Sequence, residues 1–400
     1  MIRTWIASCA AVVLMGAADP ALAQERGRAA DEAAASDPFS FTLGNSVRLA
    51  LDARLAVEAR KGGDSADLRD DMAKRRVGID GAIGKRLDFA IEGEIDGRHP
   101  WRDVYADLRI DKALRLRAGQ FKVPFSLEET TGAKHLDFVD RSLAAAQLAP
   151  GRDIGVMAHG RVWRKRLEYE GGLFRHDGDG PSATHVERTY GTTTLAGRLS
   201  VRPFAGSKAA FGDLHLGIAA TTSALPEGIS NLRGRTTLRE RFFPATYWVA
   251  GRRQRTGFEA RWRRGPFSVS SEYMRVVDER RGQAIGGEDL APLEATGWYV
   301  AGVYRVPRVI GPGHNSRIEL TTRIERLGFH SGGDGLMTMN PRADRIAAAH
   351  DRGVTFGVNW WVTRYAKVLF DAVHEQVRPA DMTLPTTSTW TPVLSVQIGL

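Results

Sequence analysis

The sequence has a single cysteine, Cys9, among its 400 residues. If residues 1–23 are removed, as argued below, the mature chain has no thiol. Neither a disulfide, nor a cysteine-ligated metal site, nor a cysteine nucleophile can then form. Long apolar runs are missing too, because no stretch after residue 23 reaches the roughly 18 uninterrupted apolar residues of a transmembrane helix. If the mature chain enters a membrane, it does so as strands.

The motifs of common exported hydrolases are also missing. Neither Gly-x-Ser-x-Gly nor His-Glu-x-x-His occurs, and the pair His374-Glu375 lacks the second histidine of a zinc motif. The run DGDG at residues 177–180 lacks the further spaced ligands of a calcium loop and favours a turn. We therefore expect no catalytic residue, no metal and no cofactor.

The N-terminus has the three parts of a secretory signal. Arg3 precedes an apolar stretch over residues 5–18, and Ala21-Leu22-Ala23 supplies the small residues of a cleavage site. The stretch is short for a membrane span, and Asp19-Pro20 ends it. We predict that residues 1–23 are a removed signal peptide, residues 24–40 a polar linker and residues 41–400 one exported domain.

Apolar and polar side chains alternate along most of this domain. Over residues 41–58, for example, Leu51 and Leu55 share one parity, while Asp52 and Glu58 share the other. A period of two predicts strands, and we interpret this segment as one long strand. Similar segments bring the total to about sixteen strands: residues 76–83, 88–96, 102–111, 114–121, 153–164, 167–175, 192–203, 211–223, 254–264, 267–278, 295–306, 316–328, 353–363, 366–377 and 392–400.

The connections between these strands alternate in length. Tight turns, such as residues 84–86 and 264–266, alternate with long loops, such as residues 122–152, 224–253 and 329–352. Aromatic residues also gather near strand ends, as at Trp360-Trp361. An even strand count, short periplasmic turns, long external loops and aromatic girdles are typical of outer-membrane barrels. The sequence thus predicts an all-β fold, a transmembrane antiparallel β-barrel in the bacterial outer membrane.

One stretch carries a family resemblance. From Gly119 the chain reads GQFKVPFSLE, followed by RSL at residues 141–143 and LAPGRDIG at residues 148–155. These motifs and their spacing resemble the phosphate-selective porin O and P family, with Glu128-Glu129 and the final Leu400 as departures from its basic loop and aromatic end. The resemblance implies a sixteen-stranded trimeric channel with its third loop folded into the pore. Pro124 and a helix-like run over residues 141–148 support that placement.

The formal charge of +9 favours anionic partners. Only nine of the 56 basic residues are lysine. On the polar faces of the predicted strands, however, acidic and basic residues are nearly equal in number, so their charges almost cancel. Each candidate below has a salt bridge within the wall as its alternative. The candidate anion contacts are Arg115, Arg117, Lys122, Lys134, Arg141, Arg48, Arg54, Arg198 and Arg261, because rings of basic residues favour anions in pores. The expected acidic wall consists of Asp88, Glu92, Glu94, Glu128 and Glu129.

The function expected from these features is passive diffusion of small hydrophilic solutes, with a preference for anions such as phosphate or polyphosphate. A weakly selective general porin, an outer-membrane enzyme and a plugged structural barrel stand as alternatives. The expected partners are outer-membrane lipid, lipopolysaccharide, small anions and two further copies in a homotrimer, and export argues against nucleic acid. We expect the basic segment from Arg233 to Arg253 to be external, facing solvent or lipopolysaccharide phosphate.

Overall fold

The computed structural model describes residues 39–44, 46–62, 68–95, 101–178, 191–243, 246–307, 316–333, 335 and 338–399. The predicted signal peptide, most of the predicted linker, Asp96 and Leu400 lie outside these ranges. Among the described residues, none of the helices has the length and hydropathy of a membrane span.

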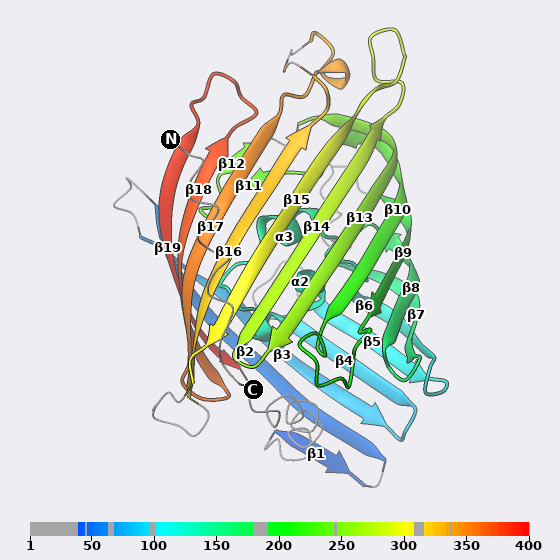
Figure 1. Cartoon of the computed structure of the whole chain (residues 1–400). Helices are drawn as coiled ribbons and strands as arrows, with labels where there is room; N and C mark the ends of the chain where they lie inside the picture. Colours follow the sequence, from blue (N-terminus) through cyan, green and yellow to red (C-terminus); the bar gives the residue numbers. More distant parts are fainter. Residues whose placement is uncertain are drawn as a thin grey trace.

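The described strands form one closed antiparallel barrel (Figure 1). It contains nine strands from β2 to β10 and seven from β13 to β19, sixteen in all, and β19 closes the ring on β2. The strands are β2 (Val47–Lys61), β3 (Leu68–Ile83), β4 (Leu87–Glu94), β5 (Trp101–Arg109), β6 (Arg115–Lys122), β7 (Arg152–Val162), β8 (Leu167–His176), β9 (Thr192–Val201), β10 (His215–Ile229), β13 (Trp248–Arg264), β14 (Phe267–Arg280), β15 (Leu290–Arg305), β16 (Arg317–His330), β17 (Ala349–Trp361), β18 (Ala366–Arg378) and β19 (Thr387–Gly399). The predicted sixteen-stranded barrel is confirmed.

The first strand differs from its prediction. Residues 41–58 are not one strand, because β1 (Ser40–Leu43) turns back and pairs antiparallel with the start of β2. Gly44 has a φ of 60°, a left-handed conformation that glycine adopts without strain. Side-chain parity missed this reversal, since the alternation continues across the turn.

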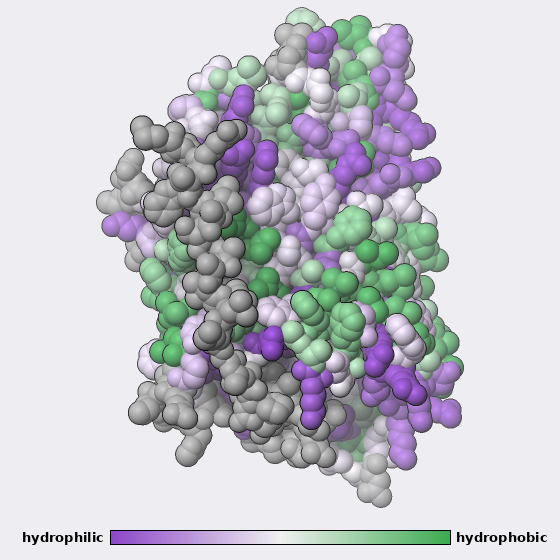
Figure 2. Space-filling view, viewed as in Figure 1, coloured by the Kyte–Doolittle hydropathy of each residue, from purple (hydrophilic) through white to green (hydrophobic). Residues whose placement is uncertain are grey.

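The alternation sorts side chains between the outside and the inside of the barrel. On β19, Leu394, Val396 and Ile398 are exposed on the outer face, while Ser395 and Gln397 are buried inside. The view in Figure 2 shows apolar side chains around mid-height with hydrophilic ones above and below. This arrangement fits a barrel whose outer wall meets hydrocarbon and whose lumen is polar.

The two ends of the barrel differ as predicted. One end has tight turns, with Gly84 and Gly265 at positive φ, and the other end has the long connections over residues 123–151, 230–247 and 331–348. The wall at the loop end is taller than predicted, because β10 reaches Ile229 and β13 begins at Trp248. Apolar side chains such as Leu225 and Val249 are buried on the inner face of this extension.

Cysteine labelling tests this topology, since the mature chain is predicted to have no thiol. We expect Ile285→Cys and Met339→Cys, both highly exposed in long loops, to react on intact cells with a maleimide polymer too large for the pore. Lys85→Cys and Lys165→Cys, exposed in the turns at the other end, serve as matched controls and should react only after lysis. Labelling of both sets on intact cells would contradict the assignment of the ends.

Candidate functional site: an arginine-lined chamber above the third loop

The connection between β6 and β7, called L3 here (residues 123–151), folds into the barrel. It contains α2 (Leu127–Thr130), the turn η1 (Ala133–His135) and α3 (Leu143–Leu148), and Figure 1 shows both helices inside the ring of strands. Ser126 and Ser142 cap the two helices by accepting a hydrogen bond from a backbone N–H three residues on. The predicted position of the loop is therefore confirmed.

One face of α3 packs against the inner wall of β14, β15 and β16. Leu143, Ala144 and Leu148 are buried there in the main apolar cluster of the barrel. Gly297 of β15 permits this close approach, because a Cβ atom at that position would lie 2.8 Å from the Cβ of Ala144. The wall thus combines an apolar patch for the helix with polar groups for the rest of L3.

Carboxylates on the wall accept hydrogen bonds from the backbone of L3. The donors are Leu127 N and Glu128 N to Glu272, each at 2.8 Å, Val139 N to Asp371 at 2.8 Å, and Leu143 N to Glu325 at 2.6 Å. Wall donors reach L3 carbonyls in the same way, with Asn359 bonded to Asp137 O at 2.7 Å and Lys367 bonded to Leu136 O at 2.8 Å. These bonds occupy backbone groups that no helix or sheet satisfies, and so they fix the loop across the lumen.

A second connection, called L5 here (residues 230–247, described except for 244 and 245), also bends inward. It contains β11 (Gly234–Arg235) and β12 (Arg241–Phe243), and Phe243 stacks on Phe329 of the wall with ring centroids 4.1 Å apart. Gln147 of α3 exchanges two hydrogen bonds with the backbone of Arg235, both at 2.7 Å. L3 and L5 are thereby joined inside the barrel.

L5 also reaches the far wall. The N–H of Thr237 donates to Glu375 of β18 at 2.8 Å, and Arg60 of β2 donates to the carbonyl of Thr237 at 3.0 Å. The expectation of a wholly external basic segment is therefore wrong for L5. Its apolar residues Phe242 and Phe243 are buried, and burying them draws the neighbouring arginines into the lumen.

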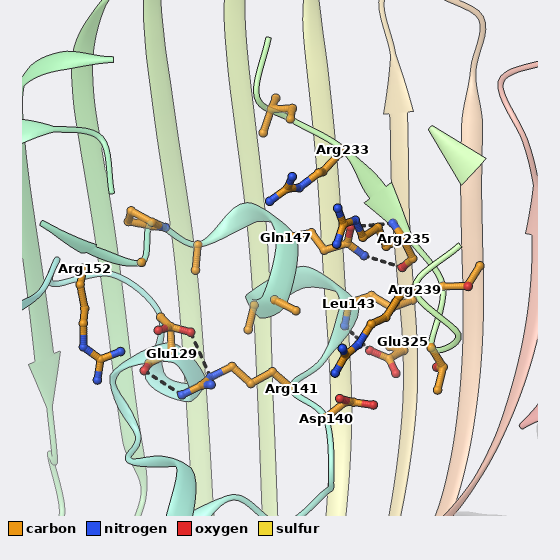
Figure 3. Close-up of a pocket in the computed structure, with 18 of the residues that line it drawn as sticks. Glu129, Asp140, Arg141, Leu143, Gln147, Arg152, Arg233, Arg235, Arg239 and Glu325 are labelled. Atoms are coloured by element: carbon orange, nitrogen blue, oxygen red, sulfur yellow. Dashed lines mark hydrogen bonds and ion pairs between the residues drawn. The ribbon is translucent and has the colours of Figure 1, made fainter. Parts of the chain in front are cut away.

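Between L3, L5 and the wall lies a chamber with a volume of about 480 Å³ (Figure 3). Its charged lining, among the described residues, consists of ten arginines and five carboxylates. The arginines are Arg60, Arg76, Arg102, Arg141, Arg152, Arg233, Arg235, Arg239, Arg255 and Arg323, and the carboxylates are Glu129, Asp140, Asp177, Glu325 and Asp371. Cations exceed anions two to one in this enclosed space.

Arg233 and Arg255 of the chamber have donors that no described residue uses. Arg233 forms no hydrogen bond or ion pair with any residue that the structure describes, and in Figure 3 it lies above α3. Arg255 is buried; its Nε donates to Leu148 O at 3.1 Å and one Nη to Asp177 at 3.2 Å, while its other Nη has no partner. Burial by itself would raise the pKa of Asp177, but Arg253 and Arg255 hold that pKa below its usual value. Asp177 is thus an ionised support for the arginines.

The candidates that the sequence placed on or beside L3 have different roles. Arg141 lines the chamber and forms an ion pair with Glu129 at 3.0 Å. Lys122 donates to the carbonyls of Glu129 and Thr131, at 2.5 and 3.1 Å, and so anchors L3. Lys134, on η1, is exposed and forms no ion pair within the described part of the chain.

Most of the remaining candidates form salt bridges within the wall. Arg115 and Arg117 each bind Asp107 at 2.7 Å, and Arg198 binds Glu259 at 2.6 Å. The acidic candidates are paired too: Asp88 with Arg115, Glu92 and Glu94 with Arg76, and Glu128 with Ser142. None of these wall arginines lines the chamber except Arg76.

The last three candidates lie outside the chamber. Arg48 is exposed near the turn end of β2, and Arg54 is buried with its Nε lacking a partner. Arg261 is half-buried and has no ion pair with a described residue. They share the inward parity expected of lumen residues, but they do not meet L3 and L5 at one place.

Sequence reasoning missed several chamber residues. Arg60, Arg102, Arg152 and Arg255 were not among the candidates, although each lies in or beside a segment with strand alternation. The apolar pair Phe242-Phe243 within a basic loop was the available signal that L5 folds inward. Which arginines converge depended on how the two loops cross, and alternation carries no information about that.

Removing one wall carboxylate tests the anchoring of L3. We expect Glu272→Ala to leave two backbone N–H groups without an acceptor, which costs about 2 kcal/mol or more of loop anchoring. Single-channel recordings should then show a higher and noisier conductance. Glu170→Ala is the matched control, because Glu170 pairs with Arg198 on the wall and has no described contact with L3. Identical recordings for both variants would show that Glu272 does not hold the loop.

Comparisons with known proteins agree with this geometry. The channel DcaP of Acinetobacter baumannii has a TM-score of 0.60 and 12% identity, covering 90% of this chain and 99% of its own. The anion-selective porin from Comamonas acidovorans has a TM-score of 0.56 and 11% identity, covering 88% and 100%. A trimer form of the Vibrio cholerae outer-membrane protein OmpT has a TM-score of 0.55 and 11% identity, covering 89% and 100%.

At these identities the likenesses concern the fold alone. No curated protein matches the chain. The sequence model of one family, phosphate-selective porin O and P, matches residues 46–386, which is most of the chain. Together with the closed barrel and the inserted L3, this match confirms the family resemblance: the chain belongs to the phosphate-selective porin O and P family and is an outer-membrane porin.

Proposed function

We propose that this porin favours small anions, with phosphate and polyphosphate as the preferred class, and that the chamber above L3 is where they are selected. The observation that carries the proposal is the lining of ten arginines against five carboxylates in about 480 Å³. A confined space with low-dielectric walls focuses the field of its net charge, so anions concentrate there and cations are repelled.

The charges along the rest of the described lumen support selection of anions in the chamber and not along the whole wall. Towards the turn end, Arg115 and Arg117 share Asp107, and Arg198 lies between Glu259 and Glu170. These pairs leave little net charge at their own positions, although Arg48 and Arg261 elsewhere on the wall have no ion pair with a described residue. The larger excess of positive charge is that of the chamber, with ten arginines against five carboxylates.

Phosphate fits the open donors of the chamber. A guanidinium presents parallel N–H groups that match two oxygens of one phosphate. Arg233 and the Nη of Arg255 without a described partner are available for this. Lys134 of L3 does not line the chamber but adds a cation without a described ion pair in the lumen. A chain of linked phosphates can bridge several such points, which favours polyphosphate over a single halide.

A second candidate function is a weakly selective general porin. It is favoured by the ion pairs that the chamber's arginines form, such as Arg141 with Glu129, and Arg152 with Asp103 at 2.7 Å. If these pairs cancel most of the field, cations and anions pass at similar rates. Reversal potentials in a gradient of potassium chloride separate the two functions directly.

The assembly and processing of the chain also belong to the proposal. We infer a homotrimer, supported by the fold shared with an outer-membrane protein solved in a trimer form, and we infer removal of residues 1–23. Native mass spectrometry of the purified porin should give three chains, each with the mass of residues 24–400. A monomer, or a chain that keeps Met1, would contradict the corresponding inference.

Charge reversal in the lumen tests the anion preference. Arg233→Glu combined with Lys134→Glu replaces two unpaired cations by carboxylates, so we expect the ratio of anion to cation permeability to fall by about twofold or more. The change should shrink as salt rises, because mobile ions screen the introduced charges. Block of chloride current by inorganic phosphate should weaken in the same variant.

Arg364→Glu provides the control, because it reverses the charge of one arginine at an exposed turn outside the lumen, the same reversal that each half of the double variant makes. Its reversal potential should equal that of the unmodified porin. If the double variant also keeps the original reversal potential in dilute salt, selection does not occur at these residues. A reversal potential near zero in the unmodified porin would instead favour the general porin.

A further inference from the structure

The outer wall carries a second group of arginines, unrelated to the chamber. Arg326 of β16 and Arg352 of β17 are directly opposite each other in the strand register, and both are exposed. One row further towards the loops, Arg378 of β18 is opposite the half-buried His350. These four residues, called the rim patch here, face away from the lumen.

Among the described residues, no carboxylate pairs with the arginines of the rim patch. Neither Arg326, nor Arg352, nor Arg378 forms an ion pair or hydrogen bond with any residue in the described ranges. The outward carboxylate of the neighbouring strand, Glu294, is already bound through both oxygens to Arg275, at 2.7 and 3.1 Å. Like charges directly opposite each other destabilise a strand pair. An external anion at this place would remove that cost.

The neighbours of the patch indicate its position relative to the membrane surface. Arg326 is the cross-strand partner of Trp298, and Trp298 is in turn the partner of Tyr273, so the patch continues a row of outward aromatic residues. Trp and Tyr collect at the boundary between hydrocarbon and headgroups. Closer to the middle of the wall, Ile324, Phe356 and Phe370 are exposed and apolar.

The patch also lies towards the long loops, and in outer-membrane barrels this is the external side. The lipid there is lipopolysaccharide, which carries phosphate groups at the top of its acyl chains. A guanidinium pair at the hydrocarbon boundary, with an apolar wall directly beneath, matches both parts of such a molecule. A free phosphate ion would gain nothing from the apolar part.

We propose that the rim patch binds the phosphate groups of lipopolysaccharide, with the acyl chains lying along the wall beneath. From the sequence, the segment from Arg233 to Arg253 was expected to face solvent or lipopolysaccharide phosphate. Arg233, Arg235 and Arg239 of that segment line the chamber instead, and the proposed lipid contact lies on β16, β17 and β18. The binding depends on the location in the outer membrane and not on the solute preference of the chamber.

Arg326→Gln combined with Arg352→Gln tests the proposal in the full-length porin. Detergent-solubilised porin is titrated with purified deep-rough lipopolysaccharide, and bound molecules per chain are counted by native mass spectrometry. We expect the dissociation constant of the double variant to rise by about tenfold, because each basic residue near a charged membrane surface strengthens binding several-fold. Lipopolysaccharide stripped of its lipid A phosphates should bind the unmodified porin as weakly as the intact form binds the double variant.

Arg364→Gln is the matched control, since it removes an exposed arginine at the opposite end of β17 and β18. Arg326→Lys with Arg352→Lys keeps the charge and should retain most of the affinity even if the glutamine variant folds poorly. Equal affinity of Arg364→Gln and the double glutamine variant would overturn the proposal. Competition by inorganic phosphate at matched phosphate concentration would also overturn it, because the patch would then bind a solute. Loss of the trimer in the double glutamine variant would overturn it too, because the patch would then belong to a subunit interface. The reversal potential of the Arg326→Gln, Arg352→Gln variant should equal that of the unmodified porin. A change in lipopolysaccharide affinity without a change in reversal potential distinguishes lipid binding from the proposed anion selection.

Discussion

The hydrogen bonds between wall carboxylates and the backbone of L3 are the interaction on which the lumen depends. A loop of 29 residues in an aqueous channel has no sheet or long helix to satisfy its N–H groups. Glu272, Asp371 and Glu325 provide acceptors for four of them, and the apolar face of α3 adds burial against β14, β15 and β16. With L3 held in this way, Gln147 is in place to bind L5, and the two loops enclose the chamber. Weakening the wall contacts would therefore affect the chamber as a whole.

Arginine has three distinct roles in this barrel. Along the wall, residues such as Arg198 lie between carboxylates that neutralise their positive charge. In the chamber, Arg233 and part of Arg255 have donors that no described residue uses, which suits a passing anion. At the rim, Arg326 and Arg352 lie on the outer face, and no described residue of opposite charge pairs with them. The role of each arginine depends on how many carboxylates lie within ion-pair distance of it. The sequence does not show that number.

Much of the fold could be predicted, because a strand that separates hydrocarbon from water must alternate. The alternation in β19 predicts its two faces from the sequence alone, with Leu394 and Val396 outside and Ser395 inside. The insertion of L3 was predicted from its resemblance to a known family together with Pro124 and the helical run that became α3. The reversal at Gly44 was missed, because a two-residue period continues unchanged through a turn. The site was predicted less well, since Arg115 and Arg117 were named as candidate anion contacts and instead share Asp107 on the wall, which was the stated alternative.

By itself, the sequence determined the barrel, the assignment of side chains to its two faces and the unequal lengths of its connections. Each of these follows from local periodicity and from turn-forming residues, which act over a few positions of the chain. Only the tertiary structure decided which arginines remain available for a solute. The ion pair between Arg198 of β9 and Glu259 of β13 depends on strand register, and the bonds joining Gln147 to Arg235 across 88 positions depend on the crossing of two loops. Electrostatic strength falls off over a few ångströms, and distances on that scale are set only when the whole chain has folded.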